Sequence, residues 1–435
     1  PELLALQLFF ISNKISSMVS DAKHRKGMEG KAFELPGLNI NKGLEPWLPM
    51  YLHGLMHGSI ETRELAVNGI GQLVQITSSQ FLKPYLIKVT GPLIRIVGDR
   101  LPTSFKGAII ETIGLLLEKG GMSLKPFVPQ LQTTFLKSLT DSSSIVRAKA
   151  LHSLNLLVPL AARPDTLINE LTNISMHAEA DAVEDLLDAM KSVLMKLGKK
   201  ASSDTLLNCI NKMGDFHNHD SEKVRSDAAC ILGLALGNIP IDMLTPSLNT
   251  YLPQVRDTND GQFWEEFRLR ALFSVADYSH ASGAAICEGV LPSLRQGAKK
   301  IELKKGETIA SLACSASGAF ACAMRKVGGK KVEAVYLKVS NLLAGVLQYD
   351  CTGTGIAKKE AALAIKKMSK YRGSELLQKN YGILIPSLVK TLKENNMVYK
   401  YSAERAIFHL LEIRSDPSRL KSYLASSEVS PDTAR

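Results

Sequence analysis

The 435-residue sequence predicts an all-α protein, a HEAT/armadillo-like α-solenoid of about nine two-helix repeats. The main evidence is a recurring pattern: a basic or polar residue, two variable positions, a small or apolar residue, and then apolar residues at helical spacing. Its copies begin at Arg63, Lys106, Arg147, Asp185, Arg225, Arg268, Thr308, Lys359 and Lys400, at intervals of 43, 41, 38, 40, 43, 40, 51 and 41 residues. An aromatic content of only 6% also favours helices over sheets.

A second helical segment, helix A, precedes most copies of the pattern, and the pattern itself forms helix B. Several helix A segments are expected to begin at a proline, as in PLIRIVG from Pro92. Proline lacks an N–H, and the N–H groups of the first helical turn have no partner within the helix. From Pro92 onward, Leu93, Ile94, Ile96 and Val97 are expected to cover one face. Neither helix can bury its apolar face alone, so neighbouring repeats must stack.

The turn between helix A and helix B carries a polar signature in two repeats. Asp141 precedes Arg147 by six residues, and Asp220 precedes Arg225 by five. The aspartate and the arginine are expected to hydrogen-bond along the stack and so to link neighbouring repeats. A structural role is therefore the simpler interpretation of Arg147 and Arg225.

Four regions are expected along the chain. Residues 1–46 form an N-terminal helix and a long loop, residues 47–290 and 291–415 form repeats, and residues 416–435 form a polar tail. The 51-residue interval is attributed to an enlarged inter-repeat loop at residues 350–360.

Positive charge is concentrated toward one end of the chain. The formal net charge is +11, and residues 291–420 contain 23 Lys and Arg against 10 Asp and Glu. An acidic partner such as an RNA backbone is expected to meet this end without base readout. Lysine-rich faces that merely keep the solenoid soluble are an equal alternative. The candidate contacts are Lys299, Lys300, Lys304, Lys305, Lys330, Lys331, Lys366 and Lys367.

No pattern indicates an enzyme, a cofactor or a metal. The stretches VGGKK and CTGTG lack the spacing of nucleotide-binding loops. His217, His219 and Asp220 suit a solvated turn better than a metal site, which would need further ligands. The six cysteines form no CxxC pair and are expected to be free, mostly buried thiols. No apolar run is long enough to predict a transmembrane helix.

Arg95 and Arg100 lie outside the repeated pattern. Arg95 is expected to project from the face opposite to the apolar one, where a surface pair with Asp99 would account for it. Arg100 would complement the C-terminal end of its helix. If arginines in this half bind a partner, these two are better candidates than the arginines that begin helix B.

Three segments, LPMYLHGLMHGS, TGPLIRIVGDR and SLKPFVPQLQTTFLKSLTD, resemble the C-terminal HEAT array of the general control non-derepressible one family. That family is the large ribosome-associated activator of the initiation-factor-two alpha kinase. The resemblance is dense from about Trp47 to Arg147, and beyond Arg225 it is limited to the repeat architecture.

The resemblance implies a non-enzymatic scaffold without cofactor that binds the RWD domain of the kinase. It would couple the kinase to stalled ribosomes during amino-acid starvation, in the integrated stress response, and would be cytoplasmic and ribosome-associated. In the family an arginine of this region is needed for kinase binding, and that role is carried to Arg95 first, to Arg100 second and to Arg147 third. The alternatives are a transport or phosphatase-type HEAT adaptor, and a ribosome- or RNA-binding array without kinase docking.

Overall fold

The computed structural model describes residues 2–26, 40–97, 101–254, 261–303, 306–349, 355–370, 373–393 and 397–411. Within these residues every regular element is a helix, which confirms the predicted all-α class. The chain divides into two compact units, residues 1–201 and residues 202–435. We call them unit 1 and unit 2 and describe each by itself.

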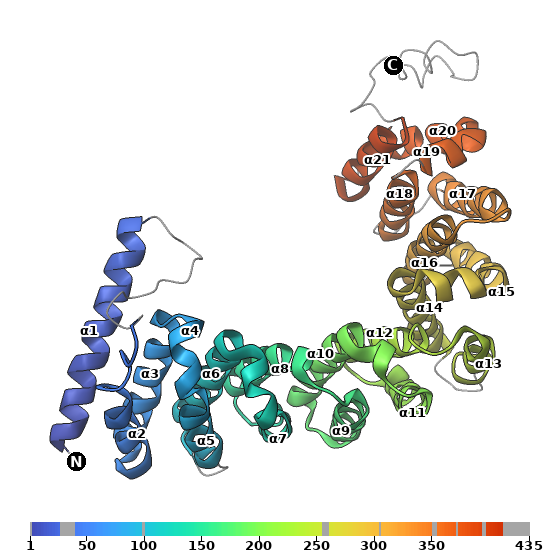
Figure 1. The fold of residues 1–435 in the computed structure, drawn as a ribbon. Coiled ribbons are helices and arrows are strands. Elements are labelled where there is room, and N and C mark those ends of the chain that lie inside the picture. Colours follow the sequence, from blue (N-terminus) through green and yellow to red (C-terminus); the bar gives the residue numbers. More distant parts are fainter. Residues whose placement is uncertain are drawn as a thin grey trace. The chain divides into compact units, whose positions relative to one another are not determined.

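The described part of unit 1 contains a long first helix, α1 (Glu2–Lys26), and four two-helix repeats (Figure 1). Figure 1 shows α5, α7 and α9 in one layer and α6, α8 and α10 in the other, so that helices A and helices B lie on opposite sides. The repeats pair α2 (Leu48–His57) with α3 (Ile60–Ile76), α4 (Ser79–Leu82) and α5 (Leu86–Ile96) with α6 (Thr103–Gly120), α7 (Val128–Ser138) with α8 (Ser144–Leu157), and α9 (Pro164–His177) with α10 (Ala180–Leu197).

The described part of unit 2 contains five repeats of the same kind. They pair α11 (Ser203–Met213) with α12 (Glu222–Leu236), α13 (Ile241–Tyr251) with α14 (Gly261–Tyr278), α15 (His280–Lys299) with α16 (Glu307–Val327), α17 (Val332–Gln348) with α18 (Ile356–Ser369), and α19 (Gly373–Leu377) and α20 (Tyr381–Lys393) with α21 (Met397–Leu410). All nine predicted starts of the pattern fall in helices B, so the described residues confirm the nine-repeat solenoid.

Stacked helices B form the continuous part of each unit. In unit 1, α3 packs on α6, α6 on α8 and α8 on α10; in unit 2, α12 packs on α14, α14 on α16, α16 on α18 and α18 on α21. Helices of one repeat also approach closely: Tyr51 of α2 is fully buried, and a Cβ at Gly69 of α3 would lie 1.9 Å from its ring. Glycine at position 69 is therefore required by this contact.

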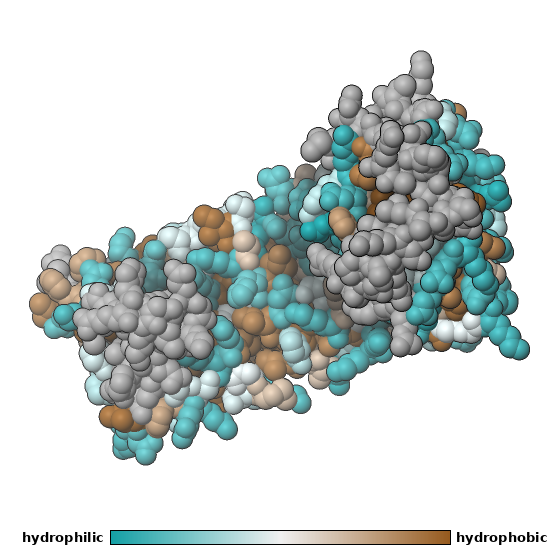
Figure 2. Space-filling model, turned by 90° about the horizontal axis from the view of Figure 1, so that it is seen from above, coloured by the Kyte–Doolittle hydropathy of each residue, from teal (hydrophilic) through white to brown (hydrophobic). Residues whose placement is uncertain are grey.

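The surface is mixed in character. Seen from above in Figure 2, hydrophobic residues form separate patches among hydrophilic ones. By length and composition α16 is apolar enough to cross a membrane, but 72% of its apolar window is buried inside the protein. It packs against α14, α15, α17 and α18, so its hydrophobicity is that of a central core helix.

Two sequence predictions about this architecture were wrong in detail. Pro92 does not open helix A of the second repeat: α5 begins at Leu86 and holds Pro92 in its interior. The extra length of the 51-residue interval does not lie in an inter-repeat loop, because α16 and α17 are long, at 21 and 17 residues, and the connection from α17 to α18 lies within one repeat. Residues 356–360 already belong to α18, and residues 350–354 lie outside the described residues.

The terminal regions are described only in part. The predicted N-terminal helix is confirmed as α1, which packs on α3. Of the predicted loop, residues 40–47 form a turn in which Leu44 is buried, while residues 27–39 and the tail after Leu411 lie outside the described residues.

Candidate partner-binding surfaces

The helix that carries Arg95 buries the predicted face, which extends further toward the N-terminus than expected. Leu86, Val89 and Leu93 of α5 are buried, at helical spacing of three and four residues. Val97 was expected on this face, but it follows the helix in an extended conformation. The face extends back to Leu86 because the helix starts six residues before Pro92.

The opposite face of α5 is open to solvent. Ile87 is 62% exposed, Arg95 is exposed in the last turn, and a Cβ at Gly91 would meet no atom within 4 Å. The spacing of these residues by four places them on one stripe. Among the described residues Arg95 has no hydrogen bond or ion pair. Asp99 and Arg100 lie outside the described residues, so their roles stay predictions.

Arg147, unlike Arg95, is buried and hydrogen-bonded within the fold. It is only 7% exposed, and its Nε donates to Asp185 Oδ2 of the next helix B at 2.6 Å. Its Nη1 donates to the carbonyl oxygens of Asp141 and Ser142 at 3.1 and 3.3 Å. Arg147 thus links neighbouring repeats as predicted, although its partner in the next repeat is Asp185 of helix B rather than an aspartate of the turn, and most of its hydrogen-bonding capacity is used inside the fold.

Asp141 extends this link to the preceding repeat. Lys106 Nζ donates to Asp141 Oδ2 at 2.8 Å, and the Ser143 N–H donates to Oδ1 at 3.0 Å. Burial raises the pKa of Asp141, but the hydrogen bonds from Lys106 and Ser143 and the charges of Lys106 and Arg147 outweigh it, so its pKa lies below the ordinary value. We call the connected residues Lys106, Asp141, Arg147 and Asp185 the helix B ladder.

Other arginines at the start of helix B act in the same way. Arg63 Nε donates to the Gly58 carbonyl oxygen at 3.0 Å, and Arg225 Nη1 donates to the Asp220 carbonyl oxygen at 2.9 Å. Arg225 also lies over the Phe263 ring, 4.5 Å from its centroid. These arginines satisfy carbonyl groups of the turn between helices, which confirms their structural role.

The lysines predicted at the basic end differ in their surroundings. Lys299 and Lys330 are exposed. Lys300 pairs with Glu265, and Lys331 Nζ lies 2.8 Å from Glu288 Oε2.

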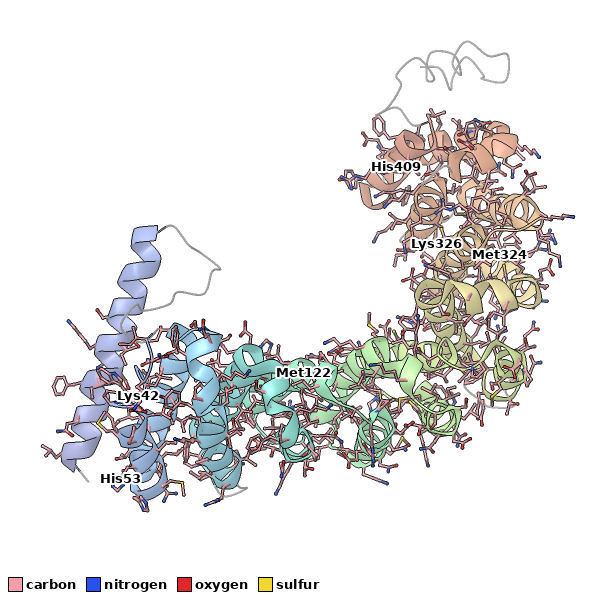
Figure 3. The ribbon with its side chains drawn as sticks, in the orientation of Figure 1. Lys42, His53, Met122, Met324, Lys326 and His409 are labelled. Carbon is pink, nitrogen blue, oxygen red and sulfur yellow. The ribbon has the colours of Figure 1, made fainter. Side chains whose placement is uncertain are left out.

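The remaining lysines of this end lie on α18 or outside the described residues. Lys367 lies 4.0 Å from an Asp277 oxygen and over the Phe273 ring, and Lys366 is half-buried in the same last turn. Lys304 and Lys305 lie outside the described residues. The ends of α16 and α18 bring further cations to this side, including Lys326, which is labelled in Figure 3.

Some ion pairs were missed by the sequence reasoning. Lys331–Glu288 and Lys379–Glu333, at 2.8 and 2.9 Å, join helices A of successive repeats. The hydrogen bond from Lys331 holds the pKa of Glu288 below its usual value, and Lys379 does the same for Glu333. Each pair spans about one repeat period, so opposite charges one period apart were a usable signal.

The histidines of the FHNHD stretch are used within the turn. The His217 ring lies edge-on to Trp264, and its Nδ1 is 3.0 Å from the Gly214 carbonyl oxygen. His219 Nδ1 accepts a hydrogen bond from the Ser221 N–H at 3.1 Å. No group of three or more metal-binding side chains occurs in the described part of the chain.

The described cysteines are free thiols, as predicted. Cys209, Cys287 and Cys314 are buried, and Cys230 and Cys322 are half-buried; Cys351 lies outside the described residues. Burial raises the pKa of the Cys287 thiol to about 12. The Cys287 thiol is therefore protonated and unreactive at neutral pH.

Comparison with known proteins adds to the match in architecture. No family model matches the chain. The protein ILITYHIA of Arabidopsis thaliana is 30% identical over 391 residues, which are 90% of this chain and 14% of the relative. The stalled ribosome sensor GCN1 of Mus musculus is 38% identical over 231 residues, 52% of this chain and 8% of that protein.

The eIF-2-alpha kinase activator GCN1 of Saccharomyces cerevisiae is 27% identical over 416 residues, 89% of this chain and 15% of that protein. The chain is homologous to the GCN1 proteins. It spans only 8–15% of the length of these three relatives. The names of the GCN1 proteins describe a sensor and an activator rather than an enzyme, in agreement with the expected non-enzymatic chain.

Solved structures agree on the fold. The karyopherin Kap121p matches all of this chain and 45% of its own chain with a TM-score of 0.64 at 15% identity. Importin beta matches 91% of this chain and 51% of its own with a TM-score of 0.54 at 12% identity. At these identities the likeness establishes the HEAT solenoid alone, whereas the sequence homology is to GCN1.

Proposed function

We propose that this chain is part of a non-enzymatic scaffold that binds the RWD domain of the initiation-factor-two alpha kinase and couples the kinase to stalled ribosomes. This function would regulate translation during amino-acid starvation, in the integrated stress response, and would place the protein on cytoplasmic ribosomes. The printed names of the GCN1 relatives, a kinase activator and a stalled-ribosome sensor, support the proposal. A transport or phosphatase-type adaptor is less well supported, because the karyopherin likeness concerns the fold.

The observation that carries the docking part of the proposal is the state of Arg95. Arg95 is exposed and without a partner among the described residues, whereas Arg147 is buried in the helix B ladder. Exposed arginines beside apolar side chains are frequent centres of binding energy in protein interfaces. Ile87, 62% exposed two turns away on the same stripe of α5, adds an exposed apolar side chain to this surface.

Binding of the full chain to the purified RWD domain tests this proposal. Calorimetric titration should give a defined dissociation constant, and Arg95→Ala should weaken it about thirtyfold, the loss typical of an interface hot spot. Arg295→Ala is the matched control, because Arg295 is an exposed arginine on a helix A of unit 2. Equal binding by Arg95→Ala and the unsubstituted chain would show that Arg95 does not dock the kinase.

A second candidate function, ribosome or RNA binding through the basic end, is favoured by a separate observation. Lys299 and Lys330 are exposed, and Lys326, Lys366 and Lys367 stand in the last turns of α16 and α18, which pack on one another. Phosphate contacts need such cations but no base-reading side chains.

The salt dependence of binding separates the two functions. Each phosphate contact to nucleic acid should contribute about −0.7 to −0.9 to the slope of log affinity against log salt, and a protein interface should give a shallower slope. The double variant Lys299→Ala/Lys330→Ala should make the slope for ribosome binding less negative by up to about 2. An unchanged slope would remove these two lysines from the proposed contact.

A further inference from the structure

The third and fourth repeats of unit 1, α7 with α8 and α9 with α10, are separated on the side of their helices A. On the helix B side, α8 packs directly on α10. A cavity of about 440 Å³ lies between α7 and α9, and a larger one of about 770 Å³ lies between the α7–α8 turn with Arg147 and the junction of α9 with α10. We call them together the 3–4 groove. The hydrogen bond from Gln132 Nε2 to Glu170 Oε2, at 2.9 Å, joins the two walls of the smaller cavity, and α9 lines both cavities.

One wall of the groove is the segment PFVPQLQTTF, which the sequence comparison had singled out. Its apolar side chains Val128, Leu131 and Phe135 are buried in the core. Pro129, Gln132 and Thr133 line the smaller cavity. Core packing therefore accounts for one face of this segment, and the groove-lining face is linked to the next repeat through Gln132.

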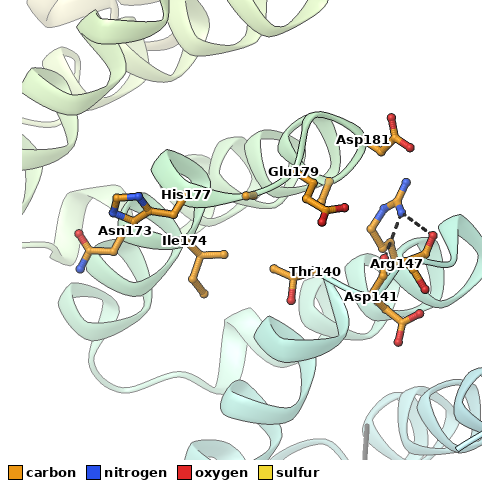
Figure 4. Close-up of a pocket in the computed structure, with 11 residues that line it drawn as sticks. Thr140, Asp141, Arg147, Asn173, Ile174, His177, Glu179 and Asp181 are labelled. Atoms are coloured by element: carbon orange, nitrogen blue, oxygen red, sulfur yellow. Dashed lines mark hydrogen bonds between the residues drawn. The ribbon is translucent and has the colours of Figure 1, made fainter. Parts of the chain in front are cut away.

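The larger cavity combines a buried donor with exposed carboxylates (Figure 4). Arg147 lines it, and with Nε and Nη1 engaged, Nη2 has no hydrogen-bond partner among the described residues. Glu179 and Asp181 are exposed on the α10 side of the same cavity. A ligand that fits must offer an acceptor to Arg147 and a cation to the two carboxylates.

The smaller cavity has the opposite charge. Lys125 and Arg163 line it and are exposed, and the carboxylate of Glu170 is already engaged by Gln132. The groove thus has an acidic end and a basic end. Along α9, Thr166 of the smaller cavity and His177 of the larger one are separated by eleven residues, or about 16 Å at the helical rise.

We propose that the 3–4 groove binds an extended segment of a partner protein. A lysine or arginine of the segment pairs with Glu179 and Asp181, and a main-chain carbonyl accepts from Arg147 Nη2. An acidic side chain about five residues away meets Lys125 and Arg163, since an extended strand covers about 3.3 Å per residue. This site is separate from the Arg95 surface and extends the proposed function.

Three fluorescein-labelled peptides of identical composition test the proposal. In two of them one arginine and one glutamate stand five positions apart, in either order, and in the third they are adjacent. Fluorescence anisotropy with the full chain should show one spaced peptide binding at least about fivefold more tightly than the adjacent one. The net charge of +11 reduces unspecific binding of the arginine elsewhere on the chain.

Two double variants locate the site. Glu179→Gln/Asp181→Asn should weaken the preferred peptide about tenfold, as expected for the loss of two exposed ion pairs. Asp204→Asn/Asp242→Asn removes two exposed carboxylates of unit 2 and should leave binding unchanged. Circular dichroism must first show intact helices, because Asp181 also stands in the first turn of α10.

Several results would overturn the proposal. They are equal binding of spaced and adjacent peptides, equal weakening by both double variants, or no binding at about 1 mM peptide. Dimerisation of the chain that Glu179→Gln/Asp181→Asn abolishes would assign the groove to a second copy instead. Arg95→Ala should not affect peptide binding, so failure of the kinase proposal and failure of this one are distinguishable.

Discussion

The α5 face and the helix B ladder both present arginine in unit 1, and they use it differently. Arg147 is buried and donates to Asp185 and to two turn carbonyl oxygens, whereas Arg95 is exposed and has no partner among the described residues. Positive charge alone therefore does not identify a binding surface in a solenoid. The useful criterion is whether the donors of a cation are already engaged within the repeat stack.

Truncation of a buried apolar side chain of unit 1 should give the largest loss of stability. Leu131 of α7 is fully buried, so Leu131→Ala should lower the free energy of unfolding by about 2–5 kcal/mol. Ile87→Ala on the exposed face of α5 is the matched control and should change it by less than about 0.5 kcal/mol. Urea unfolding followed by circular dichroism, with hydrogen exchange at α7 and α8, measures both. Similar losses for the two variants would contradict the assigned faces.

Substitution of Arg147 in the helix B ladder should give the next largest loss of stability. Arg147→Ala leaves Asp185 without its cation and two turn carbonyl groups without a donor, and we expect a loss of about 2–3 kcal/mol. Arg147→Lys keeps the charge but not the fork of donors, so it should recover only part of the loss. The same unfolding measurement applies. A loss below about 0.5 kcal/mol for Arg147→Ala would mean that the ladder contributes little and that Arg147 is available to a partner.

The ladder should also make stability depend on pH. The pKa of Asp141 is lower in the folded chain than in the unfolded one, so its contribution is fully present above the unfolded value of about 3.9. The contribution is lost as the pH falls through the folded pKa. Unfolding curves from neutral to acid pH should therefore show a steeper loss of stability for the unsubstituted chain than for Asp141→Asn. Parallel curves would show that Asp141 titrates alike in both states.

The regular parts of this comparison could be predicted from the sequence. The nine helix B starts and the Asp141–Arg147 link follow from a local pattern that repeats along the chain. The start of α5 could not be placed correctly, because Pro92 was taken as a helix start. A helix interior tolerates this proline since only the Lys88 carbonyl loses its N–H donor, and Lys88 lies on the solvent side where water replaces it.

The 3–4 groove had no counterpart in the sequence patterns. It depends on how far α7 and α9 diverge while α8 and α10 stay packed, which is a property of two stacked repeats rather than of any one segment. The buried half of PFVPQLQTTF follows from helical periodicity. Whether its other face lines a cavity depends on α9, whose residues lie about one repeat later in the chain.

Arg95→Ala should have the smallest effect on stability, below about 0.5 kcal/mol. Arg95 is exposed and has no partner among the described residues, so its removal strands no buried group. Its remaining contribution is a favourable interaction with the C-terminal end of α5, a few tenths of a kcal/mol at an exposed site. Arg295→Ala in unit 2 serves as the control under the same urea conditions. A loss above about 1.5 kcal/mol would show that Arg95 has a structural role like that of Arg147. The α5 face would then no longer be a candidate docking surface.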